Sequence, residues 1–343
     1  MNLYSTDRSI AAKFFLLGCF FCILAISCGK KSPTDSDSNQ WSAVNSGLEN
    51  LFVRFLAVHP SNSDIIFSGT WGGLYKSTDG AQTWTRLDSG WTYSQISAIA
   101  FDALHPETMY VGTYGSGVFK SEDGGESWEG KKVGLVDPTI YSIATDPTHS
   151  DTLFIGCDGG INRSYNGADT LFYIFYYNRA SLAVHPQNSQ IVYAGGKFDN
   201  FYKSEDGGDS WSVGNNGINL NGPSARIQWV LINPIDPNIL YVGSNVMGVY
   251  KSTNAAGLWT NVVKGFGGTR DVRVIGMSPS NTDCLYAATN NGVYRSTDAG
   301  QNWAQWNEGL TEVDVKALAV APFTPHVVYA GTWGEGVFKR SSQ

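Results

Sequence analysis

An aspartate recurs at a fixed place in this sequence, two residues after a serine and five before a tryptophan; the copies are Asp79, Asp123, Asp206 and Asp298. Carboxylates at such a regular spacing could bind a cation or transfer a proton. Their neighbours indicate a structural role instead, because aspartate accepts backbone N–H bonds in tight turns and a following glycine tolerates a positive φ. We therefore predict turns at these sites, called Asp turns below, and neither metal ligands nor catalytic acids.

The tryptophan that ends each copy is expected to bury its ring against a neighbouring unit of structure. These tryptophans are Trp84, Trp128, Trp211, Trp259 and Trp303. Two further copies carry asparagine in place of aspartate, and Asn254 can keep the turn hydrogen bond without a charge. The copy at Asn166 departs further, because Leu171 and Phe172 stand where a tryptophan is expected.

Aromatic residues at a second repeated position could bind a ligand. Trp71, Tyr114 and Trp333 each follow a Gly-Thr pair, and we expect them to form an arc on one face of the molecule. Exposed aromatic side chains offer a large contact area with little entropy to lose, and their flat faces suit sugar rings. The alternative is that each ring packs on its own neighbours. The other repeats carry Asp158, Lys197-Phe198, Asn245 and Asn290 at this position.

Basic residues occupy a third repeated position, near the start of each repeat. They are Arg54, Arg273 and Lys316, and the other repeats carry Ser97, Tyr141, Ala180 and Gln228 there. Nearby lie Arg179, Arg226, Arg270, Asp271 and Asp314. Guanidinium groups bind carboxylates through paired hydrogen bonds, so this position could bind an acidic partner. Glycoside hydrolysis would need two carboxylates across one sugar, and Asp158 and Asp314 are the acidic residues to test first.

The repeat itself predicts the fold. The serines that mark the copies of this repeated motif are Ser77, Ser121, Ser164, Ser204, Ser252, Ser296 and Ser341, at spacings of 40 to 48 residues. Each unit contains four short apolar runs bounded by Gly, Pro, Asn and Asp, which is typical of strands and turns, and no segment after residue 40 has a helical period. We therefore predict an all-β fold, a seven-bladed β-propeller with four antiparallel strands in each blade.

The two ends of the propeller predict how the ring closes. The last repeat stops before the strand that would begin at its tryptophan. Residues 41–48, beginning at Trp41, match such a strand segment, residues 303–310, but are not preceded by the rest of a repeat. We expect the segment from Trp41 to supply the outermost strand of the blade built from residues 310–341. A strand paired in this way leaves no open edge in the ring.

The repeated motif resembles the Asp-box, or BNR, repeat of sialidases, sortilin-type receptors, xyloglucanase-like glycoside hydrolases and photosystem II assembly factors, over residues 41–341. Its sequence is most similar to that of the sortilin and xyloglucanase subtype. The resemblance implies that each Asp turn joins the third and fourth strands of a blade. A sialidase would need three arginines on one carboxylate and a motif that is missing here. The xyloglucanase-like enzymes pair two propellers, each giving one catalytic aspartate, whereas this chain holds one.

Composition excludes several classes of function. The net charge is −7, and there is no run of Lys and Arg, so we do not expect nucleic acid as a partner. Cys157 and Cys284 lie in repeats three and six, too far apart for a disulfide, and are expected to be buried thiols. The sequence has no clustered metal ligands, phosphate loop or dinucleotide fingerprint, so we predict no metal and no cofactor.

The first 40 residues predict where in the cell the protein is located. Arg8 and Lys13 precede an apolar run that ends in the sequence Leu24-Ala-Ile-Ser-Cys28, which resembles a bacterial lipobox. We predict a lipoprotein signal peptide at residues 1–27, lipidation of Cys28, a flexible tether at 28–40 and the propeller at 41–343. Ordinary signal cleavage after a small residue is the alternative. The location would be the bacterial cell envelope, and the absence of Asp after Cys28 favours the outer membrane.

The function predicted from the sequence is a lipid-anchored, non-enzymatic propeller that binds a protein or a polysaccharide. The contact residues would be the aromatic and basic ones named above, where loops meet at the mouth of the central channel. The alternative is a glycoside hydrolase acting on envelope or plant-type glycans. An assembly role, as in the photosystem II factors, is a third reading.

Overall fold

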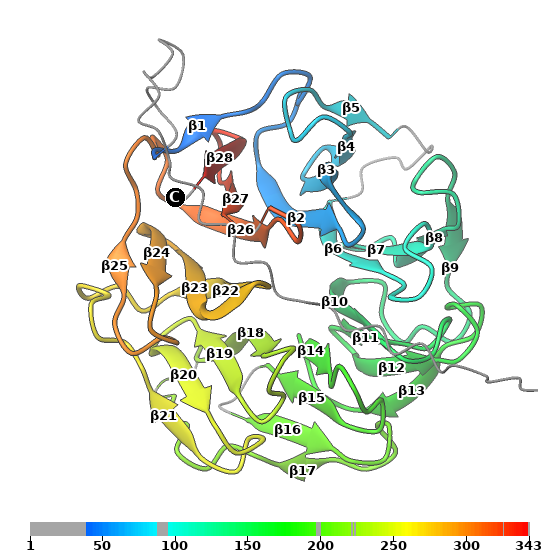
Figure 1. Cartoon of the computed structure of the whole chain (residues 1–343). Helices are drawn as coiled ribbons and strands as arrows, with labels where there is room; N and C mark the ends of the chain where they lie inside the picture. The colour runs from blue at the N-terminus through cyan, green and yellow to red at the C-terminus, as the bar shows by residue number, and fades with distance from the viewer. Residues whose placement is uncertain are drawn as a thin grey trace, which may run out of the picture. The chain divides into compact units, whose positions relative to one another are not determined.

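The computed structural model describes residues 39–87, 95–196, 200–220, 222, 224–324 and 326–341. These residues form seven four-stranded antiparallel sheets arranged in a ring, and they contain no helix (Figure 1). The predicted seven-bladed β-propeller is confirmed. The predicted signal peptide, Cys28 and most of the tether lie outside the described residues.

We number the blades from the first complete one, and list their strands from the centre of the ring outward. Blade 1 contains β2 (Val53–His59), β3 (Asn62–Thr70), β4 (Gly73–Ser77) and β5 (Thr85–Arg86). Blade 2 contains β6 (Ile96–Phe101), β7 (Met109–Thr113), β8 (Val118–Ser121) and β9 (Glu129–Lys131). Blade 3 contains β10 (Ile140–Thr145), β11 (Leu153–Cys157), β12 (Gly160–Ser164) and β13 (Phe172–Phe175). Blade 4 contains β14 (Ser181–Val184), β15 (Val192–Gly195), β16 (Phe201–Ser204) and β17 (Ser212–Val213).

The remaining blades follow the same order. Blade 5 contains β18 (Ile227–Ile232), β19 (Leu240–Ser244), β20 (Gly248–Ser252) and β21 (Trp259–Asn261). Blade 6 contains β22 (Val272–Ser278), β23 (Asn281–Thr289), β24 (Gly292–Ser296) and β25 (Ala304–Gln305). Blade 7 contains β26 (Val315–Val320), β27 (Val327–Thr332), β28 (Val337–Ser341) and, from the other end of the chain, β1 (Ser42–Ala43).

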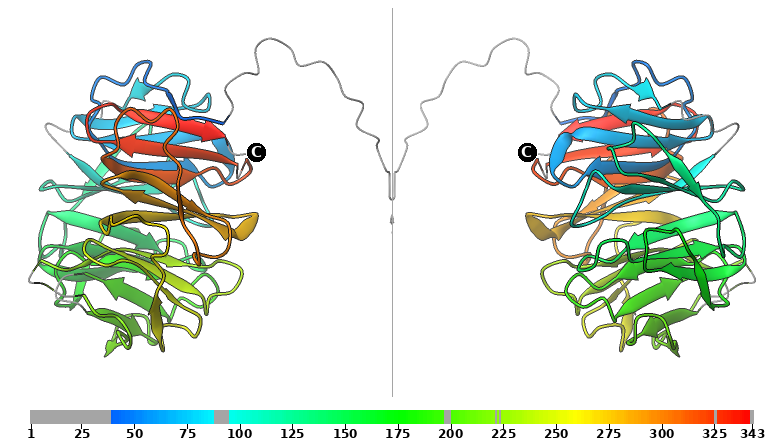
Figure 2. Two further views of the ribbon diagram at one scale, coloured as in Figure 1. Left: turned by 90° about the vertical axis from the view of Figure 1, so that its left-hand side faces the viewer. Right: turned by 90° about the vertical axis from the view of Figure 1, so that its right-hand side faces the viewer.

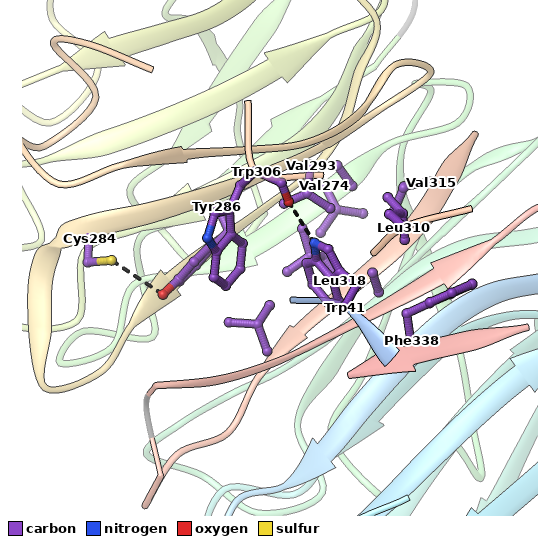
Figure 3. Close-up of a cluster of buried hydrophobic side chains, with 13 residues drawn as sticks. Trp41, Val274, Cys284, Tyr286, Val293, Trp306, Leu310, Val315, Leu318 and Phe338 are labelled. Carbon is purple, nitrogen blue, oxygen red and sulfur yellow. Dashed lines mark hydrogen bonds between the residues drawn. The ribbon is translucent and has the colours of Figure 1, made fainter. Parts of the chain in front are cut away.

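Strand β1 closes the ring as predicted. It pairs antiparallel with β28, with Ser42 opposite Lys339 and Ala43 opposite Phe338. The Trp41 side chain beside it is 2% exposed, and its Nε1 donates a hydrogen bond of 2.6 Å to the carbonyl of Trp306 in blade 6 (Figure 3). Trp41 therefore fills the core between blades 6 and 7, in addition to completing the sheet of blade 7.

The Asp turns have the hydrogen bonds that their sequence predicts. The Ser77 hydroxyl donates to Asp79 and accepts the backbone N–H of Ala81, and the Asp79 carboxylate accepts the N–H and the hydroxyl of Thr83. These bonds lower the pKa of Asp79 to about 2, the hydroxyl of Thr83 having the largest effect. Asn254 accepts the equivalent backbone bond, from Leu258, without a charge. The aspartates of this repeat thus stabilise turns between third and fourth strands.

The tryptophans of the repeat divide into two groups by their hydrogen bonds. Three indoles donate to backbone carbonyls of the preceding blade; they are Trp84, Trp259 and Trp303. Trp128 and Trp211 instead donate to carbonyls of their own Asp turns, at Gly125 and Gly208. Their rings still pack across the blade boundary, because Trp211 stacks on Phe175 of blade 3 at 5.3 Å and Trp128 packs with the blade 1 core around Phe67.

Backbone contacts assign the two faces of the ring. On one face the Asp turn of blade 1 contacts the start of β3, beside the β2–β3 turn, through the N–H of Gly80 and the carbonyl of Asp64. On the other face the β3–β4 loop contacts the start of β2, through the N–H of Trp71 and the carbonyl of Phe52. The edge-on views show the strands running between these faces (Figure 2). We call the second face the mouth, since the inner strands begin there.

Within the described part of the chain, no group of three or more His, Cys, Asp and Glu side chains could hold a metal ion. Cys157 and Cys284 are free and buried, as predicted. A search of the same residues for a helix with the length and apolar character of a membrane span finds none.

Candidate functional site

A β-bulge near the start of the inner strands positions the side chains of the mouth. In β2, Val53 lies opposite Thr70 and Phe55 opposite the next residue back, Gly69, so Arg54 has no partner. The same irregularity recurs in β6, β10, β18, β22 and β26, and the residues without partners are Ser97, Tyr141, Gln228, Arg273 and Lys316. A bulge turns the unpaired side chain toward a new direction, here the channel. This is the repeated position singled out in the sequence.

A cavity of about 440 Å³ occupies this end of the channel and is lined by residues from all seven blades. Four of the residues predicted to bind a ligand line it, namely Arg54, Arg273, Lys316 and Trp333. Ser97, Tyr141, Ala180 and Gln228 line it as well, together with Arg179, Arg226 and Asp271. The volume falls within the range of small-ligand sites.

An aromatic cluster stands beside the cavity, on blades 7 and 1. The rings of Trp71 and Trp333 meet edge to face, with centroids 4.8 Å apart, and Phe52 contacts each of them at 5.9 and 5.4 Å. Trp71 is 41% exposed and Phe52 40% exposed. The Lys316 ammonium lies 4.9 Å from the centre of the Trp333 ring. The cluster therefore presents indole and phenyl surface to solvent at the edge of a cationic cavity.

Tyr114, on the adjacent blade 2, takes part in a second cluster with Tyr141 and Asp158. The hydroxyls of Tyr114 and Tyr141 lie 3.0 Å apart, and Tyr141 donates to the Asp158 carboxylate at 3.2 Å. Asp158 also pairs with Arg179 at 3.2 Å, and the Arg179 guanidinium lies 5.0 Å from the centre of the Tyr141 ring. This cluster joins the predicted acidic candidate Asp158 to a cation and a phenol.

Arg179 holds its position in that cluster at a conformational cost. Its φ is 57°, in the left-handed region. Such a backbone costs a side-chain-bearing residue about 1–3 kcal/mol and persists only where its surroundings enforce it. The Arg179 N–H bonds to the carbonyl of Cys157, which fixes the connection between blades 3 and 4.

A second charged network lines the opposite part of the cavity, on blades 5 to 7. Arg273 pairs with Asp271 at 2.9 Å and also with Asp314, and Asp314 pairs with Lys316 at 3.0 Å. Gln228 donates to Asp271 at 2.6 Å. Burial alone would raise the pKa of Asp314, but hydrogen bonds from Arg273 and Lys316 outweigh it and hold the pKa below its ordinary value. Asp314 is therefore a carboxylate at neutral pH and a poor general acid.

Two arginines of the cavity have no carboxylate partner among the described residues. The Arg54 side chain makes no ion pair and no hydrogen bond with the described residues, and its guanidinium carbon lies 5.7 Å from the centre of the Tyr114 ring. The Arg226 guanidinium makes a single hydrogen bond to the described residues, of 3.3 Å, to the amide oxygen of Gln228. Burial lowers the pKa of Arg54 although Tyr114 and Tyr141 oppose this. Since arginine remains charged in proteins, both are cations available to a ligand.

Phe55 and Trp229 were not singled out by the sequence analysis, yet they shape the cavity. Each follows the bulged residue of its strand, and both line the cavity. Their rings meet across the channel, from blades 1 and 5, with centroids 6.4 Å apart. The buried Nε1 of Trp229 has no hydrogen-bond partner in the part of the chain that the structure describes. The signal that could have found them is their place directly after the aligned basic position.

The remaining predicted loop residues have structural contacts. Asn245 bonds to the backbone of Ser224 and Arg226, and Asn290 accepts the hydroxyl of Thr269. Arg270 donates to the carbonyl of Thr269 and does not line the cavity. Lys197 and Phe198 lie outside the described residues.

Comparison with known proteins places the chain among propellers, and no family model matches it. Over 165 residues it is 28% identical to a protein named xyloglucanase from Hypocrea jecorina, covering 46% of this chain and 19% of that one. Over 134 residues it is 38% identical to a probable oligoxyloglucan-reducing end-specific xyloglucanase from Neosartorya fischeri, covering 30% of this chain and 16% of that one. The chain thus spans less than a fifth of either curated relative.

Solved structures show the same fold at low identity. A GH74 enzyme of Niastella koreensis superposes with a TM-score of 0.69 and 22% identity, over 88% of this chain and 53% of that chain. YCF48, in a structure described as bound to a D1 peptide, superposes with a TM-score of 0.65 and 16% identity, over 90% of this chain and 98% of that one. The chain corresponds to about half of the GH74 structure and to nearly all of YCF48.

Proposed function

We propose that this propeller binds a glycan at the mouth of its channel. The observation that carries the proposal is the partly exposed cluster of Phe52, Trp71 and Trp333 beside a cavity of about 440 Å³. Aromatic faces stack on the apolar faces of sugar rings, and the charged residues of the cavity can bind hydroxyl groups. The names of the two curated relatives, both xyloglucanases, support a carbohydrate ligand.

The test is a titration with a panel of neutral and acidic oligosaccharides that includes xyloglucan fragments. Trp71→Ala and Trp333→Ala should each weaken binding by about tenfold or more, the usual effect of removing a central aromatic contact. Phe323→Ala is the matched control, since Phe323 is 65% exposed on the face with the Asp turns. The absence of binding to every member of the panel by the folded protein would refute the proposal.

The second candidate is glycoside hydrolysis, which the xyloglucanase and GH74 comparisons favour. Three carboxylates line the cavity or pair with its cations, and each is hydrogen-bonded to a cation or an amide; they are Asp158, Asp271 and Asp314. Because the pKa of Asp314 lies below its ordinary value, a hydrolytic site would use Asp314 as a base and take its acid from elsewhere.

Hydrolysis is tested by the release of reducing ends from xyloglucan and from acidic glycans. Asp314→Asn and Asp158→Asn would abolish turnover while leaving oligosaccharide binding within a few-fold of the unaltered protein. If the unaltered protein binds the glycan and releases no reducing ends, this second candidate is rejected and glycan binding stands.

We also propose that the propeller is held at the bacterial envelope by a lipid on Cys28. The lipobox-like sequence before Cys28 and the polar residues after it support this. Metabolic labelling with a palmitate analogue in a bacterial host should mark the unaltered protein and not Cys28→Ala. A labelled Cys28→Ala protein would contradict the proposal.

A further inference from the structure

We propose that the glycan bound at the mouth is acidic, and that Arg54 and Arg226 bind the carboxylate of a uronic acid unit inside the cavity. This inference rests on the proposed glycan binding and deepens it by naming the class of sugar. It differs from what the xyloglucanase comparisons alone would suggest, and it comes from the charges of this chain's own channel.

The first argument is the excess of positive charge in the cavity. Five cationic side chains line the cavity, and three carboxylates line it or pair with them, which leaves an excess of two positive charges in a protein whose net charge is −7. The cations are Arg54, Arg179, Arg226, Arg273 and Lys316. Three of them are neutralised by Asp158, Asp271 and Asp314. The excess therefore belongs to Arg54 and Arg226.

The second argument is the state of Arg54. A half-buried guanidinium without an acceptor has lost part of its hydration and has gained no ion pair in return. Burying a charge is unfavourable unless it is paired and hydrogen-bonded. A ligand carboxylate would supply two acceptors to the planar group, the arrangement in which arginine binds most strongly. A neutral sugar would leave this charge without a partner.

The third argument is the position of Arg54 relative to the aromatic cluster. Arg54 follows Phe52 by two residues where β2 begins, and two residues of chain span at most about 7 Å. Phe52 contacts both Trp71 and Trp333. A sugar stacked on these rings would therefore bring a carboxylate on the same unit, or on the next one, within reach of Arg54.

The experiment compares an oligogalacturonate with its fully methyl-esterified form, which keeps the same sugar chain and has no charge. We expect the acid to bind at least about tenfold more tightly than the ester, because hydrogen bonds to charged groups are the stronger ones. Arg54→Gln should reduce the affinity for the acid to that for the ester, and Arg54→Lys should recover part of the difference. The preference should also shrink as the salt concentration rises.

The matched control is Lys264→Gln, which removes one positive charge from an exposed residue that does not line the cavity and should leave the preference unchanged. Thermal unfolding of every variant shows whether the propeller remains folded. Equal binding of acid and ester would overturn this inference while leaving glycan binding intact. Failure to bind either form or any neutral glycan, with Arg54-dependent binding of an acidic peptide instead, would overturn both proposals.

Discussion

The aspartates of the Asp turns are held as carboxylates by short local hydrogen bonds. Hydroxyl and backbone donors at the fourth residue after each aspartate lower the pKa values of Asp79, Asp123 and Asp206 to about 2. The hydroxyl groups of Thr83, Ser127 and Ser210 contribute most. These residues need no ligand to explain them, and their role can be tested through pH.

We predict that acid weakens the propeller through these three carboxylates. Their folded pKa values lie below the ordinary value of 3.8, so the stability they contribute is complete above pH 3.8 and is lost as the pH falls toward 2. In the triple variant Asp79→Asn, Asp123→Asn, Asp206→Asn, the thermal midpoint should decrease less between pH 4 and pH 2 than it does in the unaltered protein. Asn166 and Asn254 show that asparagine keeps the backbone bond. An equally large decrease of the thermal midpoint in the variant and in the unaltered protein would contradict this prediction.

At the scale of the elements, neighbouring blades are joined by one repeated backbone contact. The N–H that opens an outer strand donates to a carbonyl just after the outer strand of the preceding blade, as from Trp303 to Lys264 at 2.8 Å. A glycine follows that carbonyl each time, at Gly47, Gly134, Gly217, Gly265 and Gly309. Each has a positive φ and lies so close to the next blade that a Cβ would meet a backbone oxygen.

We predict that Gly265→Ala loosens the contact between blades 5 and 6. A Cβ at Gly265 would lie 1.8 Å from the carbonyl oxygen of Trp303, and φ there is 97°. Gly267→Ala is the control, because φ is 61° there and nothing lies within 4 Å of the added Cβ. The control should lose about 1–2 kcal/mol of unfolding free energy from the left-handed backbone. Gly265→Ala should lose a further ~1–3 kcal/mol from the steric clash.

Equal losses in the two alanine variants, measured by denaturant unfolding, would mean that the blades can move apart at no cost, and the close approach would have no role in stability. The five contacts are described for the junctions of blades 7–1, 2–3, 4–5, 5–6 and 6–7. The hydrogen-bond pattern of Trp128 and Trp211 differs at the other two junctions, where the indole donates to its own turn.

At the scale of the whole molecule, the ring depends on one strand from the opposite end of the chain. Trp41 bonds through its backbone N–H to Glu308, through its indole to Trp306, and packs edge to face on the Trp306 ring at 5.2 Å (Figure 3). Asn45 continues the closure by bonding to the backbone of Val337 and Glu335.

We predict that Trp41→Ala costs about 3–5 kcal/mol of unfolding free energy, the usual loss for a buried tryptophan. Deletion of residues 41–48 should lower the thermal midpoint further, because it also leaves the edge of β28 unpaired. Trp71→Ala, which truncates a partly exposed indole packed on Trp333 and Phe52, should cost less, about 0.5–1.5 kcal/mol. A Trp41→Ala protein as stable as Trp71→Ala would show that the closing strand does not hold the ring.

The sequence by itself determined the seven blades, the Asp turns and the closing strand from Trp41, because each depends on a local pattern that repeats or on a segment that matches a missing piece. It also aligned Arg54 with Arg273 and Lys316, and thereby identified the basic position of the mouth. These features follow from strand periodicity and turn chemistry, which act over a few residues.

Only the tertiary structure decided how those side chains meet. The bulges that turn Arg54 and its equivalents into the channel cannot be recognised in the sequence pattern. One unpaired residue changes the direction in which side chains of a strand point without changing the composition of the strand. Phe55 meets Trp229 from a blade that is not its neighbour, and Arg273 bridges two carboxylates. Such contacts depend on the radius of the closed ring, which sets the distances across the channel and is fixed only when all seven blades have packed.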